Sequence, residues 1–261
     1  MDLLLCSRLG RPRCLCRRLD RPVNESTAPA VRLAGLTFAY PDGTGALRGV
    51  DLDIARGERV AILGPNGAGK STLMLHLNGV LSATSGEVYI GGTRVDRTTV
   101  RAVRRRVGVV FQDPDDQLFM PTVEQDVAFG PVNFGMRGED LAENVRFALA
   151  AVGMTDRADR SPARLSLGER RRAALATVLA CRPEVLVLDE PAANLDPVAR
   201  RELAEILLTL PTTLVLVTHD LPYAQRICER AVILDSGRIV ADGPIDEILA
   251  DAQLLAAHRL S

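Results

Sequence analysis

Residues 64–72, with the sequence GPNGAGKST, constrain the fold of this chain more than any other segment. The segment matches the P-loop pattern Gly-x-x-x-x-Gly-Lys-Ser in full. It follows a short apolar run at 59–63, which is typical of a buried strand, and it precedes helical spacing of apolar residues at 71–81. Strand, glycine-rich loop and helix together aim backbone N–H groups at phosphate oxygens. We therefore predict a nucleoside triphosphate site at Gly64, Pro65, Asn66, Gly67, Ala68, Gly69, Lys70, Ser71 and Thr72.

Lys70 is the only lysine in the chain, because 31 of the 32 basic residues are arginine. A compact ammonium on a flexible stem fits a phosphate-cradling loop, whereas a planar guanidinium is too bulky. We expect Lys70 to reach the β- and γ-phosphates and the Ser71 hydroxyl to ligate Mg²⁺. The alternative, an ordinary glycine turn between strand and helix, leaves the agreement of the whole pattern unexplained.

The composition predicts a chain that buries a sizeable core as one domain, with room for a smaller lobe. It has 261 residues, of which 47% are hydrophobic, and its net charge is −1. That charge balance does not predict a nucleic-acid partner. The longest apolar stretches are near nine residues, against about 20 for a membrane span, so a membrane role requires a partner. Five cysteines without framework spacing favour a reducing cytoplasm.

Residues 1–30 differ from the rest, with six arginines before Val23 and no apolar core of a secretory signal. We expect a disordered extension, or sequence from an upstream start codon. Cys14 and Cys16 resemble half of a metal site, but no second pair with suitable spacing follows. Two solvent-exposed thiols are the favoured interpretation.

An acidic pair, Asp189 and Glu190, follows directly after the apolar run 185–188. Four consecutive apolar residues predict a strand that is buried on both faces. Its C-terminal end is where α/β sheets place their ligands, and buried carboxylates need a partner such as a metal ion. We expect Asp189 to hold Mg²⁺ and Glu190 to polarise the attacking water. The alternative is a helix-capping aspartate beside a surface glutamate.

Two further polar residues end apolar runs that we interpret as buried strands. Gln112 follows the run 107–111, and His219 follows the run 213–217. If these strands are parallel, His219 and Gln112 lie at the same end of the sheet as Glu190.

The remaining chain suggests two additions to a strand–helix core. Residues 31–40 and 49–54 alternate apolar and polar side chains around a Pro-Asp-Gly turn, which predicts an antiparallel β-layer. Tyr40 stands at that turn, where it either stacks on adenine or packs at a strand end. Residues 121–135 and 139–152 predict helices without a strand between them, and hence a separate helical lobe.

Residues 165–169, LSLGE, begin another predicted helix. Ser166 and Glu169 have the spacing of a capping box. An exposed helix N-terminus with Ser166 and Gly168 is also suited to receive an anion, here the γ-phosphate of a second nucleotide. Further along, Asp196 is predicted to cap a helix that starts at Pro197.

Taken in order, these segments resemble the ATP-binding subunit of an ABC transporter, from about residue 31 to about residue 243. The resemblance comprises a Walker A loop (64–72), a Q-loop glutamine (Gln112), a signature (165–169), a Walker B strand (185–190), a D-loop (193–196) and a switch histidine (His219).

The resemblance implies an α/β fold with a P-loop NTPase (RecA-like) core, a mainly parallel sheet, an N-terminal antiparallel β-layer and an inserted helical subdomain at about 114–182. The ATP-binding domain would span 31–261. ATP and Mg²⁺ are the implied cofactors, with Gln112 joining Ser71 and Asp189 at the metal. The implied catalytic residues are Glu190, His219, Gln112 and Lys70. It also implies a homodimer or heterodimer in which Ser166, Gly168 and Glu169 meet the partner's ATP, with Asp196 in the D-loop and Tyr40 stacking on adenine.

Residues 111–135, FQDPDDQLFMPTVEQDVAFGPVNFG, look more narrowly like the energy-coupling-factor group, particularly the ATPases of cobalt and nickel importers. The likeness implies transmembrane importer subunits that meet this segment at the cytoplasmic face of the membrane. Vitamin importers of the same group look alike here. A soluble ABC-type ATPase, a small-molecule kinase and a binding module without turnover are the rival functions.

The signature departs from the usual LSGGQ of the family, because Leu167 replaces a glycine and Glu169 replaces the glutamine. Glu169 near a phosphate adds negative charge unless capping or an arginine neutralises it. Slower turnover or an asymmetric dimer is the expectation that follows.

Overall fold

The computed structural model describes residues 28–260, so most of the predicted N-terminal extension, with Cys14 and Cys16, lies outside the described residues. The last residues of that extension are packed in the fold. Ala28 and Ala30 are buried, and the Ala30 carbonyl accepts a hydrogen bond from the Gly91 N–H. The fold therefore includes residues 28–30, which the sequence had placed in the extension.

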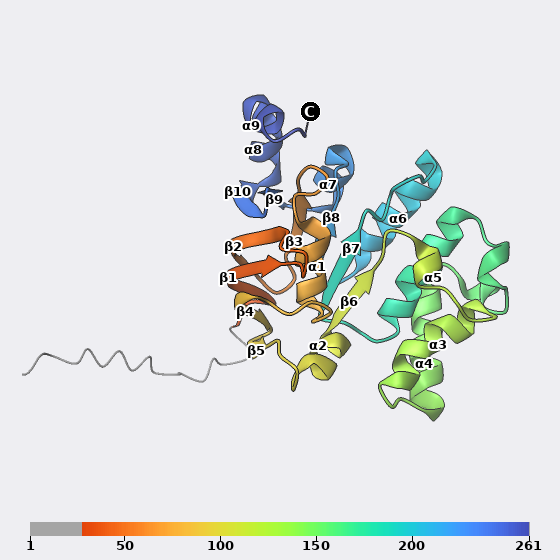
Figure 1. Cartoon of the computed structure of the whole chain (residues 1–261). Coiled ribbons are helices and arrows are strands. Elements are labelled where there is room, and N and C mark those ends of the chain that lie inside the picture. The colour runs from red at the N-terminus through yellow and green to blue at the C-terminus, as the bar shows by residue number, and fades with distance from the viewer. Residues whose placement is uncertain (1–27, 261) are drawn as a thin grey trace, which may run out of the picture.

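The central sheet has six strands in the order β10-β9-β3-β8-β7-β6 (Figure 1). Every neighbouring pair is parallel except β10 with β9, which confirms the mainly parallel sheet. The strands are β3 (Arg59–Leu63), β6 (Val107–Val110), β7 (Val185–Asp189), β8 (Thr213–Val217), β9 (Arg230–Asp235) and β10 (Arg238–Pro244).

Both faces of this sheet are buried, and each faces a different hydrophobic core. In β7, Val185 and Val187 belong to one core, whereas Leu186 and Leu188 belong to the other. Successive side chains of a strand point to opposite faces, so an uninterrupted apolar run is what a doubly covered strand requires.

A second, antiparallel sheet has the order β2-β1-β4-β5 and lies to the left in Figure 1. It confirms the predicted β-layer, although its second strand begins four residues earlier than predicted, at Gly45. The core that contains Val185 and Val187 of β7 also contains Leu33 of this second sheet, Val60 of the central sheet and Leu73 of α1. The strands are β1 (Val31–Ala39), β2 (Gly45–Ile54), β4 (Ser85–Ile90) and β5 (Thr93–Arg94).

Helices pack beside the central sheet, and the first of them, α1, follows the P-loop. It ends at Leu77 rather than at the predicted residue 81, because Asn78 leaves the helical region and Gly79 adopts φ 65°. His258 follows the last helix as its C-cap residue. These helices are α1 (Lys70–Leu77), α2 (Val100–Arg106), α6 (Pro197–Thr209), α7 (Leu221–Ile227), α8 (Ile245–Ala250) and α9 (Ala252–Ala257).

Between β6 and β7 the chain forms only helices, which make the lobe on the right of Figure 1. This confirms the inserted helical subdomain. Val127 and Leu149 join a core that continues to Leu188 of the central sheet. No helix within 28–260 has the length and apolarity to cross a membrane. The elements are η1 (Pro114–Asp116), α3 (Val123–Asn133), α4 (Gly138–Ala151), η2 (Thr155–Arg157), η3 (Pro162–Arg164) and α5 (Leu167–Leu179).

Candidate active site

The P-loop leaves the C-terminal end of β3 and is held closely between two other strands. Gly69 caps α1 with φ 104°, and a Cβ there would lie 2.6 Å from the Ala46 carbonyl oxygen of β2. A Cβ on Gly64 would overlap the Leu234 carbonyl oxygen of β9. Both glycines are therefore required by close backbone approach as well as by backbone conformation.

Lys70 folds back over the loop that precedes it. Its Nζ donates to the Gly64 carbonyl at 2.6 Å and to the Pro65 carbonyl at 2.9 Å, and the residue is only 8% exposed. Burial lowers the pKa of Lys70, while the negative charges of Glu190 and Asp189 act in the opposite direction. The solitary ammonium thus lies within electrostatic range of the acidic pair.

Ser71 and Asp189 meet across 118 residues of sequence, with Ser71 Oγ donating to Asp189 Oδ2 at 3.3 Å. Asp189 is 9% exposed, and within 28–260 this hydroxyl is the one hydrogen-bond donor to its side chain. Burial raises the pKa of Asp189, and the Ser71 hydrogen bond partly offsets that rise. A hydroxyl beside a nearly unpartnered buried carboxylate is an oxygen donor set that suits Mg²⁺.

Glu190 is held by the residues that follow β8. Its Oε2 accepts from Thr218 Oγ1 at 2.8 Å, and its Oε1 accepts from the His219 N–H at 2.9 Å. His219 Nδ1 lies 2.6 Å from the same Oε1. The parallel strands β7 and β8 thus bring the two predicted residues into direct contact, and they add Thr218, which sequence reasoning missed.

Gln112 is exposed just beyond β6 and lines an open hollow together with Asp189, Arg171 and Asn194. Within the described residues no hydrogen bond joins Gln112 to Ser71 or Asp189. The structure therefore places Gln112 beside the predicted metal position without joining it to the other two residues.

Arg171 is a second residue that sequence reasoning missed. It is 4% exposed, and its guanidinium donates to the Phe111 carbonyl at 3.4 Å and to the Ala193 carbonyl at 3.3 Å. Burial lowers the pKa of Arg171, whereas nearby acids that include Asp189 and Glu190 favour its charge. It links the segment after β6 to the segment after β7, and its sequence signal was only an arginine run in a helix.

Tyr40 lies beside the end of the P-loop. Its hydroxyl shares a hydrogen bond with Thr72 Oγ1 at 2.9 Å, and its ring packs edge-on against Phe38. The residue is 38% exposed. The predicted adenine-stacking position is therefore adjacent to the predicted phosphate-binding position.

The signature segment forms the N-terminus of α5, with Ser166 as the N-cap residue. The predicted capping box is present in full, because the Glu169 side chain also accepts from the Ser166 N–H. A Cβ on Gly168 would lie 2.9 Å from Ala199 Cβ at the start of α6, and Asp196 caps that helix as predicted. In Figure 1 the start of α5 stands apart from α1, so this segment does not reach the P-loop of its own chain.

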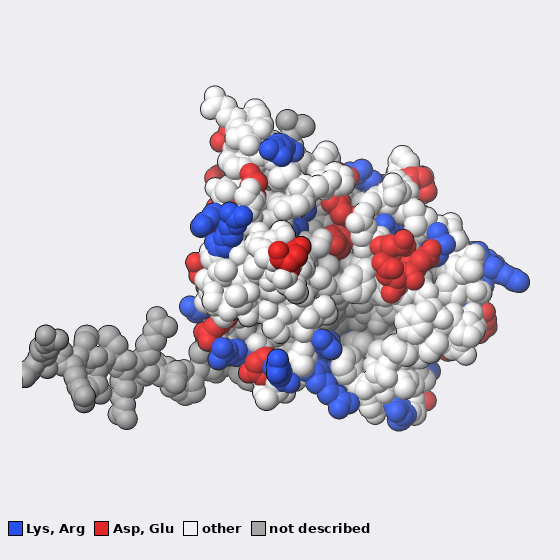
Figure 2. All heavy atoms as spheres, in the orientation of Figure 1, with Lys and Arg blue, Asp and Glu red and all other residues white. Residues whose placement is uncertain are grey.

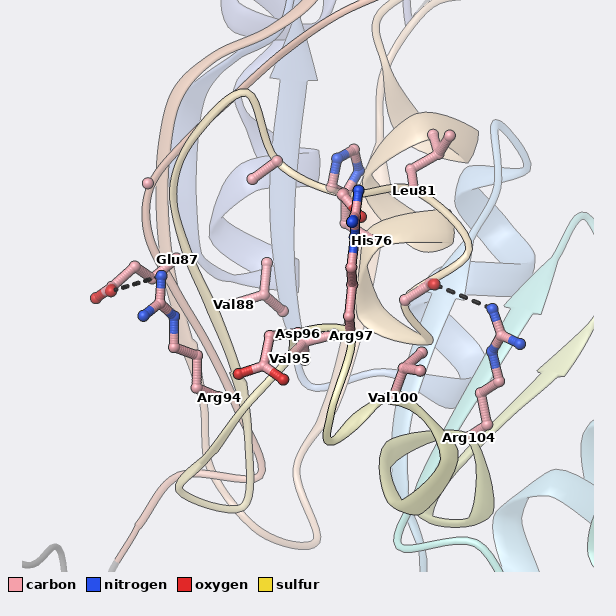
Figure 3. Close-up of a pocket in the computed structure, with 14 residues that line it drawn as sticks. His76, Leu81, Glu87, Val88, Arg94, Val95, Asp96, Arg97, Val100 and Arg104 are labelled. Carbon is pink, nitrogen blue, oxygen red and sulfur yellow. Dashed lines mark hydrogen bonds and ion pairs between the residues drawn. The ribbon is translucent and has the colours of Figure 1, made fainter.

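A separate cavity, shown in Figure 3, does not coincide with this site. It lies at the C-terminal end of α1, between His76, Glu87 and Arg104, whereas the P-loop is at the N-terminal end. Two of its arginines are already paired: Arg94 with Glu87, and Arg104 with the Gly79 carbonyl (Figure 3). The candidate active site is instead an open edge of the parallel sheet.

A P-loop after the parallel strand β3, with an aspartate–glutamate pair at the end of β7, which is separated from β3 by β8 alone, defines a P-loop nucleoside triphosphatase. The family model described as "ABC transporter" matches residues 47–193. The chain therefore belongs to the ABC transporter family, and it is an ATP-binding ATPase subunit of that family.

Two curated relatives match nearly the whole chain. One is an ABC transporter ATP-binding protein by name, from Streptomyces coelicolor, which is 59% identical over 239 residues and 92% of each chain. The other is the energy-coupling factor transporter ATP-binding protein EcfA of Methanothermobacter thermautotrophicus. It is 48% identical over 235 residues, which cover 88% of this chain and 76% of EcfA.

Two solved structures are similar in fold and sequence. cbiO1 from Clostridium perfringens, part of the ABC transporter complex cbiONQ, has a TM-score of 0.80 and 36% identity, covering 89% of this chain and 95% of cbiO1. The ATP-binding cassette MJ0796, as a dimer in a post-hydrolysis state bound to ADP and Pi, has a TM-score of 0.73 and 30% identity. That match covers 82% of this chain and 98% of the cassette.

Proposed function

We propose that this chain is the ATP-hydrolysing subunit of an energy-coupling-factor importer that takes up a transition-metal ion, cobalt or nickel, through a separate transmembrane subunit. Its likeness to EcfA and to cbiO1 supports the importer class. The single observation that carries the ATPase part is the hydrogen bonding around the acidic pair, in which Ser71 contacts Asp189 and His219 contacts Glu190. An importer of a vitamin is the alternative cargo assignment.

ATP binds along the P-loop with its base against Tyr40. Backbone N–H groups of residues 64–72 and the start of α1 surround the phosphates, and Lys70 moves from the loop carbonyls to the β- and γ-phosphates. Ser71, Asp189 and Gln112 would hold Mg²⁺. When bound, that ion supplies positive charge that offsets the charge of the phosphate oxygens.

Glu190 orients the attacking water and accepts its proton as the oxygen attacks the γ-phosphorus. The bond between the γ-phosphorus and its bridging oxygen then breaks, leaving ADP and inorganic phosphate. A base can only act if its carboxylate is held in reach of the water. Thr218 and His219 supply that restraint, because together they occupy both oxygens of Glu190.

Two ATP-binding subunits, identical or different, pair head to tail. In this arrangement Ser166, Gly168 and Glu169 of one subunit meet the ATP on the P-loop of the other, and Asp196 lies nearby. The separation of α5 from α1 within one chain supports the assignment (Figure 1). We assign 31–261 as the ATP-binding domain and 114–182 as its helical subdomain. No nucleic-acid partner is proposed.

The surface after β6 is the proposed contact for the transmembrane subunit. Figure 2 shows acidic side chains gathered over this segment, which contains Asp113, Asp115 and Asp116. Beside it, Phe119 is 61% exposed and Phe129 is 41% exposed, with their rings packed edge-on. Exposed aromatics next to charge are typical of an interaction surface. This contact would hold the chain at the cytoplasmic face of the membrane.

Transport by the purified complex tests this proposal. A tagged chain is purified from membranes with its attached integral subunits, which are then identified and reconstituted in vesicles. We expect ATP-dependent uptake of Co²⁺ or Ni²⁺ that is lost in the matched Glu190→Gln complex. Uptake of a vitamin without metal-ion uptake would favour the alternative cargo, and the absence of any integral subunit would contradict a transport role.

A further inference from the structure

The acidic residue of the signature has a specific arginine partner. Arg157, at the end of η2, donates from Nε to Glu169 Oε1 at 3.1 Å. The other carboxylate oxygen, Oε2, accepts from the Ser166 N–H at 2.9 Å. The two side chains are partly shielded from solvent, at 36% exposed for Arg157 and 21% for Glu169.

This geometry assigns each polar group at the start of α5 a role. Ser166 Oγ accepts from the Glu169 N–H at 3.2 Å, which leaves the serine hydroxyl proton available to another acceptor. The hydrogen bond from the Ser166 N–H, and then the one from Arg157, lower the pKa of Glu169. The carboxylate is therefore ionised at neutral pH, and its charge must be offset wherever this helix end approaches a phosphate.

No other arginine at this end of α5 pairs with Glu169. Arg170 lies 3.5 Å from Asp115, and Arg172 lies 3.6 Å from Glu202. Within residues 28–260, Arg157 is therefore the one cation paired with this carboxylate.

We propose that Arg157 is a positioning residue for ATP-dependent pairing of two subunits. It neutralises Glu169 and holds its carboxylate on the helix cap, so that Ser166 and Gly168 can approach the γ-phosphate bound by the other subunit. The proposal rests on the proposed function, because it requires the signature to meet a nucleotide in trans. It also accounts for how this chain tolerates an acidic residue in its signature.

A double-mutant cycle tests this role through ATP turnover of the full-length protein in its membrane complex. Arg157→Ala should lower turnover about three- to tenfold, since a partly exposed ion pair and an uncompensated charge are both involved. Glutamine also completes a capping box, so Glu169→Gln keeps the cap and removes the charge. In the Glu169→Gln background, Arg157→Ala should therefore change turnover by less than about twofold. Arg157→Lys should retain most of the activity.

Arg146→Ala is the matched control, because Arg146 forms an exposed pair with Glu139 in the same helical lobe, at 2.7 Å. It should leave turnover unchanged. Thermal melting of each variant checks that it is folded. Equal losses from Arg157→Ala in both backgrounds would show that Arg157 only supports the local fold, and no loss in either would remove its role. If the unmodified complex hydrolyses no ATP, the proposed function fails instead.

Discussion

Thr218→Val should lower both the stability of the fold and the rate of ATP turnover, because Thr218 restrains Glu190 in the candidate active site. Thr218 is 1% exposed, and its hydroxyl donates to Glu190 Oε2 at 2.8 Å. Valine keeps the shape but loses a hydrogen bond to a charged group, which costs about 1.5–3 kcal/mol. For a domain of this size that loss lowers Tm by about 3–12 °C. Glu190 keeps its contacts with His219, so turnover should fall about tenfold, part of the ~10²–10⁴ that a general base contributes.

Thr213→Val supplies the matched control, because Thr213 is also buried and begins β8, the strand that Thr218 directly follows. Its hydroxyl accepts from the Gly57 N–H at 2.9 Å, at the end of β8 remote from Glu190. Both variants should lose stability in urea unfolding, but only Thr218→Val should lose turnover below its melting temperature, with ATP affinity preserved. Equal turnover in the two variants would refute the reasoning that Thr218 restrains Glu190.

Three other changes have defined outcomes. Lys70→Arg should weaken ATP binding, because a guanidinium cannot replace an ammonium held 2.6 Å from a carbonyl. The expected loss is about 1.4 kcal/mol or more, which calorimetry would record as a tenfold rise in Kd. An unchanged affinity would contradict this steric argument. Glu184→Gln should lower stability at neutral pH, because Arg106 hydrogen bonds hold the pKa of Glu184 below its ordinary 4.5. A lowered carboxyl pKa stabilises the fold above the unfolded value, so the difference from the unmodified protein should shrink in urea melts as pH falls below about 4.5; a difference independent of pH would exclude ionisation as its cause. Gly168→Ala should lower the free energy of unfolding by about 1–3 kcal/mol, because the new methyl group overpacks against Ala199. An unchanged urea midpoint would show that α5 and α6 can move apart at no cost and would contradict this prediction.

The candidate active site was largely predictable, because most of its residues belong to short sequence motifs or directly follow an apolar strand. Lys70 and Ser71 belong to one loop, and Asp189 and Glu190 directly follow an apolar strand. Once the strands are parallel, residues that follow them must gather at the same edge. This is why the sequence predicted that His219 lies at the same end of the sheet as Glu190, and the structure places the two in contact.

Contacts between distant segments were not predictable in the same way. Arg171 reaches the Ala193 carbonyl and Arg157 reaches Glu169 only through the packing of the helical lobe. The sequence left two ways to neutralise Glu169, helix capping or an arginine, and it could not identify Arg157 because that contact depends on where η2 packs. The strands β4, β5, β9 and β10 were not predicted either. β10, for example, alternates exposed and half-buried residues without a fully buried position.

The central claim is that Lys70 and the acidic pair serve one ATP. The most direct test uses the Glu190→Gln protein and ATP that carries one label on the γ-phosphate and a second on the nucleoside, so that binding and cleavage are measured separately. We predict that this variant binds ATP with the affinity of the unmodified protein and retains the γ-phosphate uncleaved, whereas adding Lys70→Ala abolishes the binding. Hydrolysis by Glu190→Gln at the unmodified rate, or undiminished binding after Lys70→Ala, would contradict the account.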